Sequence, residues 1–372
     1  MSSASSHEGR LERVLATPPI FPDLGVPLGR SREGQPIHGF RIGRPGLRVS
    51  LLGGCHADEP VGPRLLRRLA GYLSSLPPDD PLVAEHEWWI LPHINPDGEA
   101  RNRSWSEPGA TSYDLPSYLA AVVREPPGED IEFGFPRNAE DTGARPENRC
   151  AYDWWAGAEG AFDLHVSLHG MGFAAGPWFL LDRAWALRCG HLMRTCADRT
   201  HALGYRLHDV ERRGEKGFER IDPGFCTRPD STAMRAFFEA RGDHETARLF
   251  RPSSMETIRV FGEALGGDPL TLVSEMPLFL IPGVGERLGP PDPVADRWKE
   301  RIDRWRGMLA DVADEGQVGG RGRSDTAARV RAEAAGAGLR PMPVRDQQAL
   351  QWTLISAGVE QVRVRRGKVP GG

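Results

Sequence analysis

Short apolar segments alternate with helical patterns along most of this chain. The segment 47–54, Leu-Arg-Val-Ser-Leu-Leu-Gly-Gly, is typical of a buried strand that ends at paired glycines, and residues 61–76 then carry apolar side chains at helical spacing. We expect an α/β fold, in which a mostly parallel or mixed central sheet is flanked by helices on both faces and binds ligands beyond the carboxyl ends of its strands. The other strand-like segments are 88–91, 162–168, 178–181 and 270–273, and the other helical patterns are 184–203 and 293–312.

Composition divides the 372 residues into parts with different expected roles. Two segments, 99–160 and 209–256, are dense in Pro, Gly and charge, and long irregular segments of this kind often wall a functional site. The Gly-rich and Arg-rich composition beyond residue 312 is typical of a flexible linker. The expected parts are an N-terminal extension at 1–24, the main domain at 25–312, a flexible linker at 313–345 and a C-terminal appendage at 346–372.

The charge balance and the cysteines exclude several classes of protein. Charged residues make up 26% and hydrophobic residues 39% of the chain, as in ordinary soluble proteins, and the formal net charge is -4. Without a basic field, we expect neither nucleic acid nor a membrane surface as a partner. The N-terminus lacks the pattern of a secretion signal and no apolar stretch is long enough to span a membrane, which indicates a cytoplasmic protein. The five cysteines form no Cys-x-x-Cys pair, so we expect reduced thiols.

The segment 53–60, Gly-Gly-Cys-His-Ala-Asp-Glu-Pro, contains a candidate metal site. His56 and Glu59 stand three residues apart in the turn that leaves a strand and enters a helix, where an imidazole and a carboxylate can meet. Zinc accepts such ligands, and a catalytic zinc site has three protein ligands and one position for water. The same spacing also arises by chance, with a core histidine and a glutamate that favours the helix N-terminus. The paired glycines and the strand-to-helix junction favour the metal site.

His169 is the expected third ligand, because it follows an alternating strand and precedes a glycine. His165 shares its face of the strand, but four residues of strand separate the two histidines by about 13 Å, so only one can bind the same ion. His165 is therefore expected in the core or behind the ligands. Glu275 ends another apolar segment, where a carboxylate is either a salt-bridge partner or a general base whose pKa is raised by burial. Beside a metal-activated water, such a glutamate would accept the proton of the water.

Arginines follow a turn signature, Asn-Pro-Asp-Gly, at residues 95–98. Arg101 and Arg103 come directly after it, and Arg137 and Asn138 follow further along the chain. A hydrolase that cleaves a terminal peptide bond needs a cation for the tetrahedral oxyanion and a guanidinium that grips a carboxylate. A single arginine in a sequence is also typical of a solvated surface charge.

Taken in order, these motifs resemble those of the zinc carboxypeptidase family, the metallocarboxypeptidase A-like enzymes, and indicate a divergent bacterial-type member. The ordered set is Gly-Gly-x-His-x-x-Glu, Asn-Pro-Asp-Gly with arginines, Ser-x-His-Gly and an apolar strand with Ser-Glu, and the resemblance covers roughly residues 25 to 310. It implies a sandwich around a mixed sheet of about eight strands. Two histidines and one glutamate are the zinc ligands known for carboxypeptidase A.

The resemblance also implies roles for individual residues. One Zn²⁺ per chain would be held by His56, Glu59 and His169, and Glu275 would be the general base. Arg103 or Arg101 would stabilise the oxyanion, and Arg137 with Asn138 would bind the substrate carboxylate, although the family usually has this pair in the order Asn-Arg. The family also has a mobile tyrosine that caps the substrate. Between His169 and Glu275 the only tyrosine is Tyr205, too near His169 for a clear match.

The expected function is therefore hydrolysis of a C-terminal peptide or amide bond by metal-activated water, with a small peptide or an acyl amino acid as substrate. A zinc-dependent deacylase or amidase that acts on an N-acyl or modified amino acid is the alternative, since it would use the same groups. A binding homologue without catalysis is a further alternative, against which the presence of all four candidate residues argues.

Overall fold

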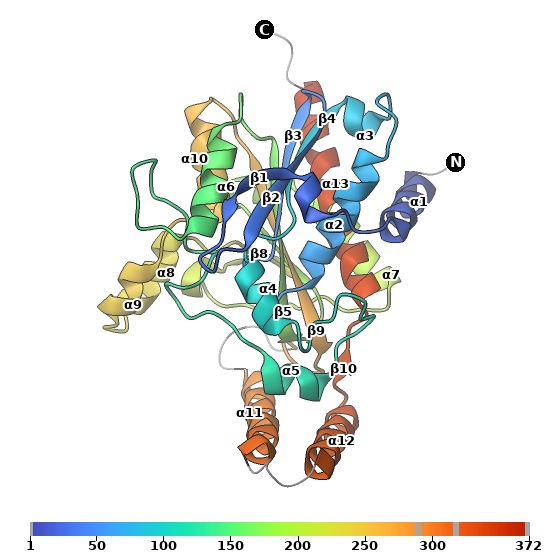
Figure 1. Ribbon diagram of the computed structural model, residues 1–372, viewed down its shortest axis with the longest axis vertical. Helices are drawn as coiled ribbons and strands as arrows, with labels where there is room; N and C mark the ends of the chain where they lie inside the picture. Colours follow the sequence, from blue (N-terminus) through green and yellow to red (C-terminus); the bar gives the residue numbers. More distant parts are fainter. Residues whose placement is uncertain (1–2, 287–288, 290–291, 315–319, 369–372) are drawn as a thin grey trace.

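A single mixed sheet forms the centre of the computed structural model, which describes residues 3–286, 289, 292–314 and 320–368. The strands are β1 (Val26–Arg30), β2 (Pro36–Gly43), β3 (Leu47–Gly53), β4 (His86–Leu91), β5 (Leu164–Ala174), β6 (Trp178–Leu181), β7 (Arg220–Asp222), β8 (Phe225–Thr227), β9 (Leu270–Leu280) and β10 (Arg340–Pro341). Their order is β1-β2-β4-β3-β5-β9-β6-β8-β7, and β10 pairs with β9 (Figure 1). The predicted α/β fold is confirmed, with ten described strands in place of about eight.

The middle of the sheet is parallel and its edges are antiparallel. β3 pairs in parallel with β4 and β5, and β5 pairs in parallel with β9, whereas β1, β2, β6 and β10 join by antiparallel pairing. The central strands are buried on both faces, which explains why their sequences read as continuous apolar runs. The register of β5 and β9 places His169 directly beside Glu275.

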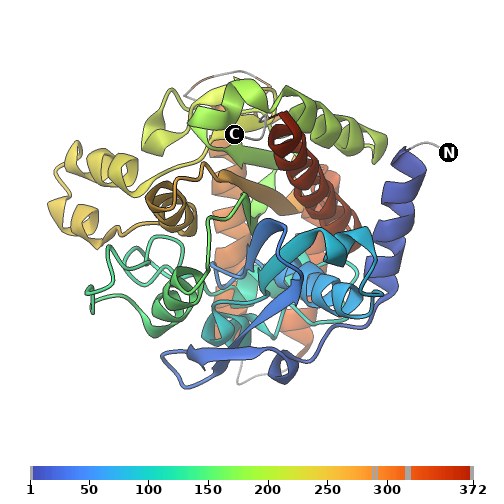
Figure 2. The ribbon, with the colours of Figure 1, turned by 90° about the horizontal axis from the view of Figure 1, so that it is seen from above.

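Helices cover both faces of the sheet (Figure 2). The α-helices are α1 (Ser3–Ala16), α2 (Val61–Ser74), α3 (Pro81–Ala84), α4 (Pro96–Asn102), α5 (Leu115–Ala121), α6 (Pro146–Ala156), α7 (Gly190–Ala202), α8 (Ser231–Glu239), α9 (His244–Leu249), α10 (Ser254–Ala264), α11 (Pro293–Asp314), α12 (Gly320–Gly336) and α13 (Val344–Lys368). Helices α2, α7 and α13 pack on one side, and α6 and α10 pack on the other. None of the helices in the described ranges combines the length and the apolar character needed to cross a membrane.

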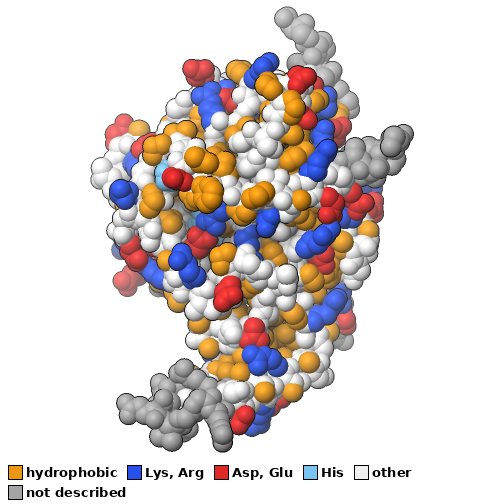
Figure 3. Space-filling model, turned by 45° about the vertical axis from the view of Figure 1, so that its right-hand side comes forward, with side chains coloured by type: hydrophobic (Ala, Val, Ile, Leu, Met, Phe, Trp, Pro, Cys, Tyr) orange, Lys and Arg blue, Asp and Glu red, His pale blue; other side chains and the backbone are white. Residues whose placement is uncertain are grey.

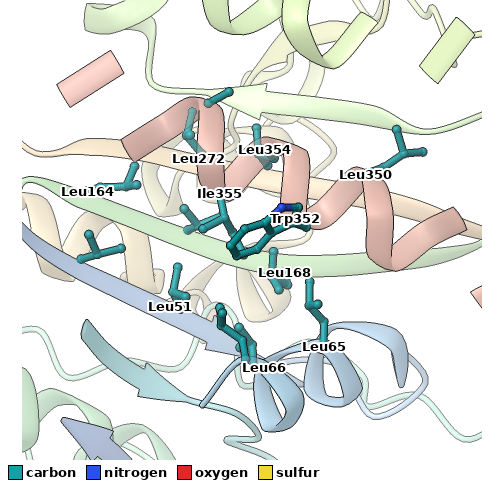
Figure 4. Packing of buried hydrophobic residues seen from close by; sticks show 14 of the residues in the cluster. Leu51, Leu65, Leu66, Leu164, Leu168, Leu272, Leu350, Trp352, Leu354 and Ile355 are labelled. Carbon is teal, nitrogen blue, oxygen red and sulfur yellow. The ribbon is translucent and has the colours of Figure 1, made fainter. Parts of the chain in front are cut away.

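The largest core lies between the sheet and the helices α2 and α13 (Figure 4). Each buried leucine of such a core contributes about 1.5 to 3 kcal/mol. Gly358 lets α13 approach the strands closely, because a Cβ atom there would lie 2.9 Å from Cδ1 of Leu272. The fully buried side chains that meet in this core include Leu51, Leu164, Leu272, Leu350, Leu354 and Ile355.

The last part of the chain differs from the expected linker and appendage. Within 313–345 the structure has α12, which packs beside α11 at the lower end of Figure 1 and buries Val330 in the same cluster as Trp305. The expected appendage at 346–372 is mostly α13, whose middle lies in the main core. At the other end, α1 lies within the expected extension and packs on α2 through Leu11 and Val14. Residues 315–319 and 369–372 lie outside the described ranges.

The surface carries charges of both signs. On the face drawn in Figure 3, Lys and Arg side chains lie interspersed with Asp and Glu side chains. Many of them form ion pairs across the surface, such as Arg331 with Asp114 and Arg366 with Asp163. Exposed pairs of this kind contribute about 0 to 1 kcal/mol each, so the apolar cores account for most of the stability.

Candidate functional site

The turn between β3 and α2 positions two of the predicted ligands. β3 ends at Gly53, and Gly54 then adopts a left-handed conformation with a φ of 72°. A Cβ atom on Gly54 would lie 2.6 Å from the ring of His93, so the close packing of this turn requires glycine. The turn brings Nδ1 of His56 to 2.7 Å from Oε1 of Glu59 before α2 begins.

The third predicted ligand, His169, reaches the same point from the middle of β5. Its Nδ1 lies 3.2 Å from Nδ1 of His56 and 3.0 Å from Oε2 of Glu59. The candidate ligand atoms of the three residues all lie within 4.8 Å of one another. The fold therefore brings together residues that are more than a hundred positions apart in the sequence.

Glu59 provides a test of whether these residues fit a zinc ion. The residue is 4% exposed, and among the described residues its Oε2 has no hydrogen-bond partner, although it lies 3.0 Å from Nδ1 of His169 in an orientation unsuited to a hydrogen bond. A buried carboxylate oxygen without a donor is costly. A cation among the two Nδ1 atoms and this carboxylate would satisfy the oxygen, and imidazole nitrogen with carboxylate oxygen is a donor set that zinc prefers. The residues present therefore fit the ion.

Polar groups behind the two histidines orient their rings. Nε2 of His56 lies 3.4 Å from Oδ1 of Asp130, and Nε2 of His169 lies 2.8 Å from Oγ of Ser167. Metal-binding histidines commonly place their second ring nitrogen against such a group, which fixes the ring and the proton on it. Both Nδ1 atoms are thereby directed toward Glu59.

The electrostatics of the cluster favour positive charge at its centre. Burial alone would lower the pKa of His56, but the carboxylates of Glu59 and Asp130 raise it to about 10. Burial also opposes the charged form of His169, yet Glu59 raises the pKa of that imidazole well above its usual value. The two histidines in turn lower the pKa of Glu59 against the effect of its burial. A bound cation would occupy the point where these effects converge.

A second group of potential ligands shares His169. Cys55, Glu132 and His169 are buried, and their candidate ligand atoms also lie within 4.8 Å of one another. Oε2 of Glu132 lies 3.2 Å from Nε2 of His169. Burial, together with Glu132, raises the pKa of the Cys55 thiol, which disfavours the thiolate that binds metals. The set that contains His56 and Glu59 is therefore the stronger of the two. The sequence analysis named neither Cys55 nor Glu132 as a ligand.

Glu275 lies beside the cluster on β9. The residue is partly buried at the wall of the cavity, and desolvation followed by the neighbouring Glu59 carboxylate raises its pKa to about 7, against the attraction of His169 and His56. Such a carboxyl group exchanges a proton easily near neutral pH, as a general base requires.

A cavity of about 340 Å³ opens onto these residues. His56, His169 and Glu275 line one part of it. The rest combines the cations Arg124, Arg212 and Lys216 and the carboxylates Glu125, Asp130 and Glu132 with apolar side chains. The apolar lining consists of Pro127, Phe133, Leu180, Phe218, Pro229, Met234, Phe238, Phe250, Met255 and Val273.

The four residues predicted to bind substrate or oxyanion do not line this cavity. Asn95 caps α4, and the helix then carries Arg101 to the surface, where it pairs with Glu33, and leaves Arg103 exposed at its end. Arg137 pairs with Asp141 at 3.6 Å, and the side chain of Asn138 accepts a hydrogen bond from the backbone of Glu140. Their expected roles at the site are corrected accordingly. The turn signature marks a helix start here, so its arginines point away from the sheet.

Arg124 reaches the cavity instead. It follows α5, and its guanidinium lies 3.4 Å from Oδ2 of Asp58 and 3.7 Å from Oε1 of Glu59. None of the sequence predictions includes this arginine, although it lies in the segment 99–160 that is expected to wall a site. The available signal was the location of that segment, because no local motif distinguishes Arg124 from the other arginines in it.

Two further expectations concern His165 and Tyr205. His165 is fully buried and contacts the hydroxyls of Ser50 at 2.9 Å and Ser254 at 3.2 Å, so it is a core residue as predicted. The hydroxyl of Tyr205 donates to Asp346 on α13, and Tyr205 does not line the cavity. Among the described tyrosines, none lines it, so another group must take any capping role.

The comparison with known families agrees with this geometry. The sequence model of the zinc carboxypeptidase family matches residues 21–173, a range that includes His56, Glu59 and His169 but not Glu275. Carboxypeptidase SOL1 of Arabidopsis thaliana is 29% identical over 163 residues, which cover 41% of this chain and 30% of that protein. The chain thus spans less than a third of the length of this relative.

Several solved structures are similar to the fold. The metallo-carboxypeptidase from Burkholderia cenocepacia has a TM-score of 0.44 and 16% identity, and the match covers 98% of this chain and 70% of that chain. Bovine thrombin-activatable fibrinolysis inhibitor, solved in complex with tick carboxypeptidase inhibitor, has a TM-score of 0.41 and 12% identity, covering 84% of this chain and 96% of that chain. The resemblance predicted from the sequence is confirmed by the match to the zinc carboxypeptidase family model, which covers residues 21–173.

Proposed function

We propose that the protein is a zinc-dependent hydrolase of the metallocarboxypeptidase type, which cleaves a C-terminal peptide or amide bond. The observation that carries the proposal is the convergence of His56, Glu59 and His169 on one point, with a carboxylate oxygen of Glu59 left without a donor, at the edge of a cavity that also contains Glu275. The cytoplasmic location expected from the sequence stays a prediction.

Side chains of this protein would provide the zinc ligands and the group that transfers the proton. His56, Glu59 and His169 would hold Zn²⁺, which when bound supplies a Lewis acid for the carbonyl oxygen and a lowered pKa for water. Glu275 accepts a proton from the attacking water and returns it to the nitrogen of the leaving amine, a role that its pKa of about 7 supports. The ring partners Asp130 and Ser167 keep both imidazoles oriented during turnover.

Arg124 takes the role that the sequence analysis gave to Arg103 or Arg101. Its guanidinium lines the cavity close to Glu59, and its side chain is half-exposed, so it can turn toward a substrate. A cation at this position stabilises the negative charge that develops on the carbonyl oxygen as the tetrahedral intermediate forms.

A deacylase or amidase is the second candidate. The observation that favours it is the location of Arg137 and Asn138, because their distance from the cavity removes the pair expected to bind a C-terminal carboxylate. An enzyme that releases an acyl group from an amino acid would use the same ligands and base, and would differ in which side of the bond it holds.

Incubation with a mixed library of peptides and N-acyl amino acids tests both candidates. Zinc-loaded protein and its Glu275→Gln variant are compared by mass spectrometry of the products. We expect the variant to keep its zinc and to lose about 100-fold or more in kcat, since the general base is gone and the ligands remain. Loss of single C-terminal residues identifies a carboxypeptidase, and release of free acyl acids identifies the deacylase.

The control is Glu263→Gln, which changes an exposed glutamate on α10 that pairs with Arg259 on the surface and does not line the cavity. This variant should match the wild type in zinc content and in rate. Equal activity of the Glu275→Gln variant and the wild type would remove Glu275 from the mechanism. Absence of turnover by a zinc-loaded wild type across the library would contradict the proposed function.

A further inference from the structure

Arg212 and Lys216 bring two cationic side chains into the cavity from the loop between α7 and β7. The guanidinium carbon of Arg212 lies 4.6 Å from the ring centre of Phe218 and 5.5 Å from that of Trp178. The ammonium nitrogen of Lys216 lies 4.6 Å from the ring centre of Phe237. Cation–π contacts at these distances hold both side chains against aromatic rings without neutralising their charge.

Neither cation has a carboxylate partner. Over the residues that the structure describes, no Asp or Glu oxygen lies within 4.0 Å of the charged atoms of Arg212 or Lys216. Arg124, the third cation that lines the cavity, pairs with Asp58 and Glu59. Partly buried charges are normally paired, so the two free cations indicate an anion that comes from outside the chain.

The backbone that carries these cations is strained. Arg213 and Lys216, with φ of 50° and 57°, are the two non-glycine residues with a left-handed backbone in the described ranges. Gly214 and Gly217 between and after them are also left-handed, with φ of 79° and 87°. For Arg213 and Lys216 this conformation is unfavourable, and such residues persist where the surrounding structure holds them, most often at ligand-binding loops. Thr227 on β8 holds this loop by donating a hydrogen bond of 2.6 Å to the carbonyl oxygen of Gly217.

The deeper lining of the cavity is apolar. Leu180, Met255 and Val273 are each 2% exposed, and they belong to one packed cluster. A ligand that fills the cavity therefore meets an apolar surface in one part and two free cations in another. A carboxylate attached to an apolar group matches this part of the cavity. The carboxylates that also line the cavity are Glu125, Asp130, Glu132 and Glu275, and over the described residues none of them pairs with either cation.

We propose that Arg212 and Lys216 bind a carboxylate of the substrate whose apolar part lies against Leu180, Met255 and Val273. This inference rests on the proposed function. It replaces the pair Arg137 and Asn138, which lies outside the cavity, and it makes substrate choice depend on the loop between α7 and β7. The carboxylate is either the C-terminal group of a peptide or an acidic side chain, and each source binds the two cations in the same way.

Four matched substrates separate these sources. The first is a peptide that ends in phenylalanine with a free carboxylate, and the second is its C-terminal amide. The third and fourth are peptide amides that end in glutamate or glutamine. Each is assayed with the zinc-loaded wild type and with Arg212→Gln, Lys216→Gln and the double variant. Arg213→Gln is the matched control, because Arg213 is the exposed neighbour on the same loop and does not line the cavity.

We expect the wild type to prefer the free carboxylate over the amide, or glutamate over glutamine. Each single variant should raise KM for the preferred substrate by about 10- to 100-fold, as expected for loss of a hydrogen bond to a charged group. The kcat should change by less than about threefold, because the chemistry at Glu275 is untouched. Activity on the neutral partner substrate and the melting temperature should stay at the wild-type values, and Arg213→Gln should behave as the wild type.

Binding measurements keep this inference separate from the proposed function. Isothermal titration of N-acetylphenylalanine and its amide into the Glu275→Gln variant, with and without zinc, reports carboxylate recognition in the absence of turnover. Weaker binding of the acid on adding Arg212→Gln, with unchanged binding of the amide, supports the proposal even if no library substrate is cleaved. If neither carboxylate source depends on Arg212 or Lys216 in turnover or binding, or if Arg213→Gln has the same effect, the proposal is wrong.

Discussion

Glu59 connects the two histidines of the candidate metal centre. One of its oxygens lies 2.7 Å from Nδ1 of His56 and the other 3.0 Å from Nδ1 of His169. The alternative ligand set, Cys55 with Glu132, meets His169 at its other nitrogen, as Glu132 Oε2 lies 3.2 Å from Nε2. His169 belongs to both sets, so its substitution cannot distinguish them. Substitution of a residue that belongs to one set alone, such as His56 or Cys55, can distinguish them.

His56→Ala should lose its zinc and Cys55→Ser should keep it. The alanine variant removes one of three ligands and leaves Glu59 with a poorer site, whereas serine preserves the size of a side chain that makes no contact with Nδ1 of His56. The measurement is the zinc content per chain by mass spectrometry of the elements after gel filtration. Retention of zinc by His56→Ala together with its loss from Cys55→Ser would assign the ion to Cys55, Glu132 and His169.

At this scale the sequence predicts ligands better than substrate contacts. His56 and Glu59 share one turn, and His169 and Glu275 are paired in the middle of adjacent parallel strands, so their meeting follows from local geometry and from strand register. The arginines lie on loops and short helices, whose direction depends on tertiary packing. No sequence motif distinguishes Arg124 from Arg101 as the residue that reaches the cavity. In the structure Arg101 pairs with Glu33 on the surface, whereas Arg124 lines the cavity.

Helix α13 is an element of the core whose sequence does not show the periodic pattern that predicts a packed helix. Its middle is buried on several sides at once, with Leu350, Leu354 and Ile355 all fully buried, so no regular polar face marks it as a packed helix. The strand-and-helix alternation around β3, α2, β5 and β9 was recognisable because each of these elements is either apolar throughout or apolar along one stripe. The Gly-rich and Arg-rich composition around the start of α12 has no apolar periodicity, so the sequence predicts a linker there instead of a helix.

Leu354→Ala should lower the free energy of unfolding by about 2 to 5 kcal/mol, because it removes a fully buried side chain and leaves a cavity against the sheet. The matched control is Val364→Ala on the same helix, where the side chain is 44% exposed and the change should stay within about 0.5 kcal/mol. Denaturant unfolding followed by circular dichroism measures both. Equal stabilities for the two variants would mean that α13 is a peripheral addition.

The molecule as a whole keeps several histidines neutral in its interior. Burial lowers the pKa of His165 to about 3 and the pKa values of His93 and His208 to about 4. At a pH above its unfolded pKa of about 6.5, a histidine of this kind is neutral in both states and its titration does not change the free energy of unfolding. As the pH falls below that value, the unfolded chain takes up a proton and the folded chain does not, so stability decreases from pH 6.5 toward the folded pKa.

His165→Gln isolates one of these contributions. Glutamine can keep a hydrogen bond to Ser50 or Ser254 but does not titrate. The difference in unfolding free energy between wild type and variant should shift in favour of the variant by about 2 kcal/mol between pH 7 and pH 5, since each pH unit below 6.5 contributes about 1.4 kcal/mol. Denaturant unfolding at the two pH values measures it. A constant difference would mean that His165 has the same pKa in the folded and unfolded states.

The location of α13 also determines when the molecule can complete its core during synthesis. The ribosome releases β3, β5 and β9 long before α13, so the nascent chain leaves Leu51, Leu164 and Leu272 without their covering helix until residue 355 and its neighbours have emerged. A large apolar face that stays open during translation attracts chaperones and other nascent chains. Production of this protein in a cell is therefore expected to depend on how quickly the residues from the end of β9 to the middle of α13 are translated.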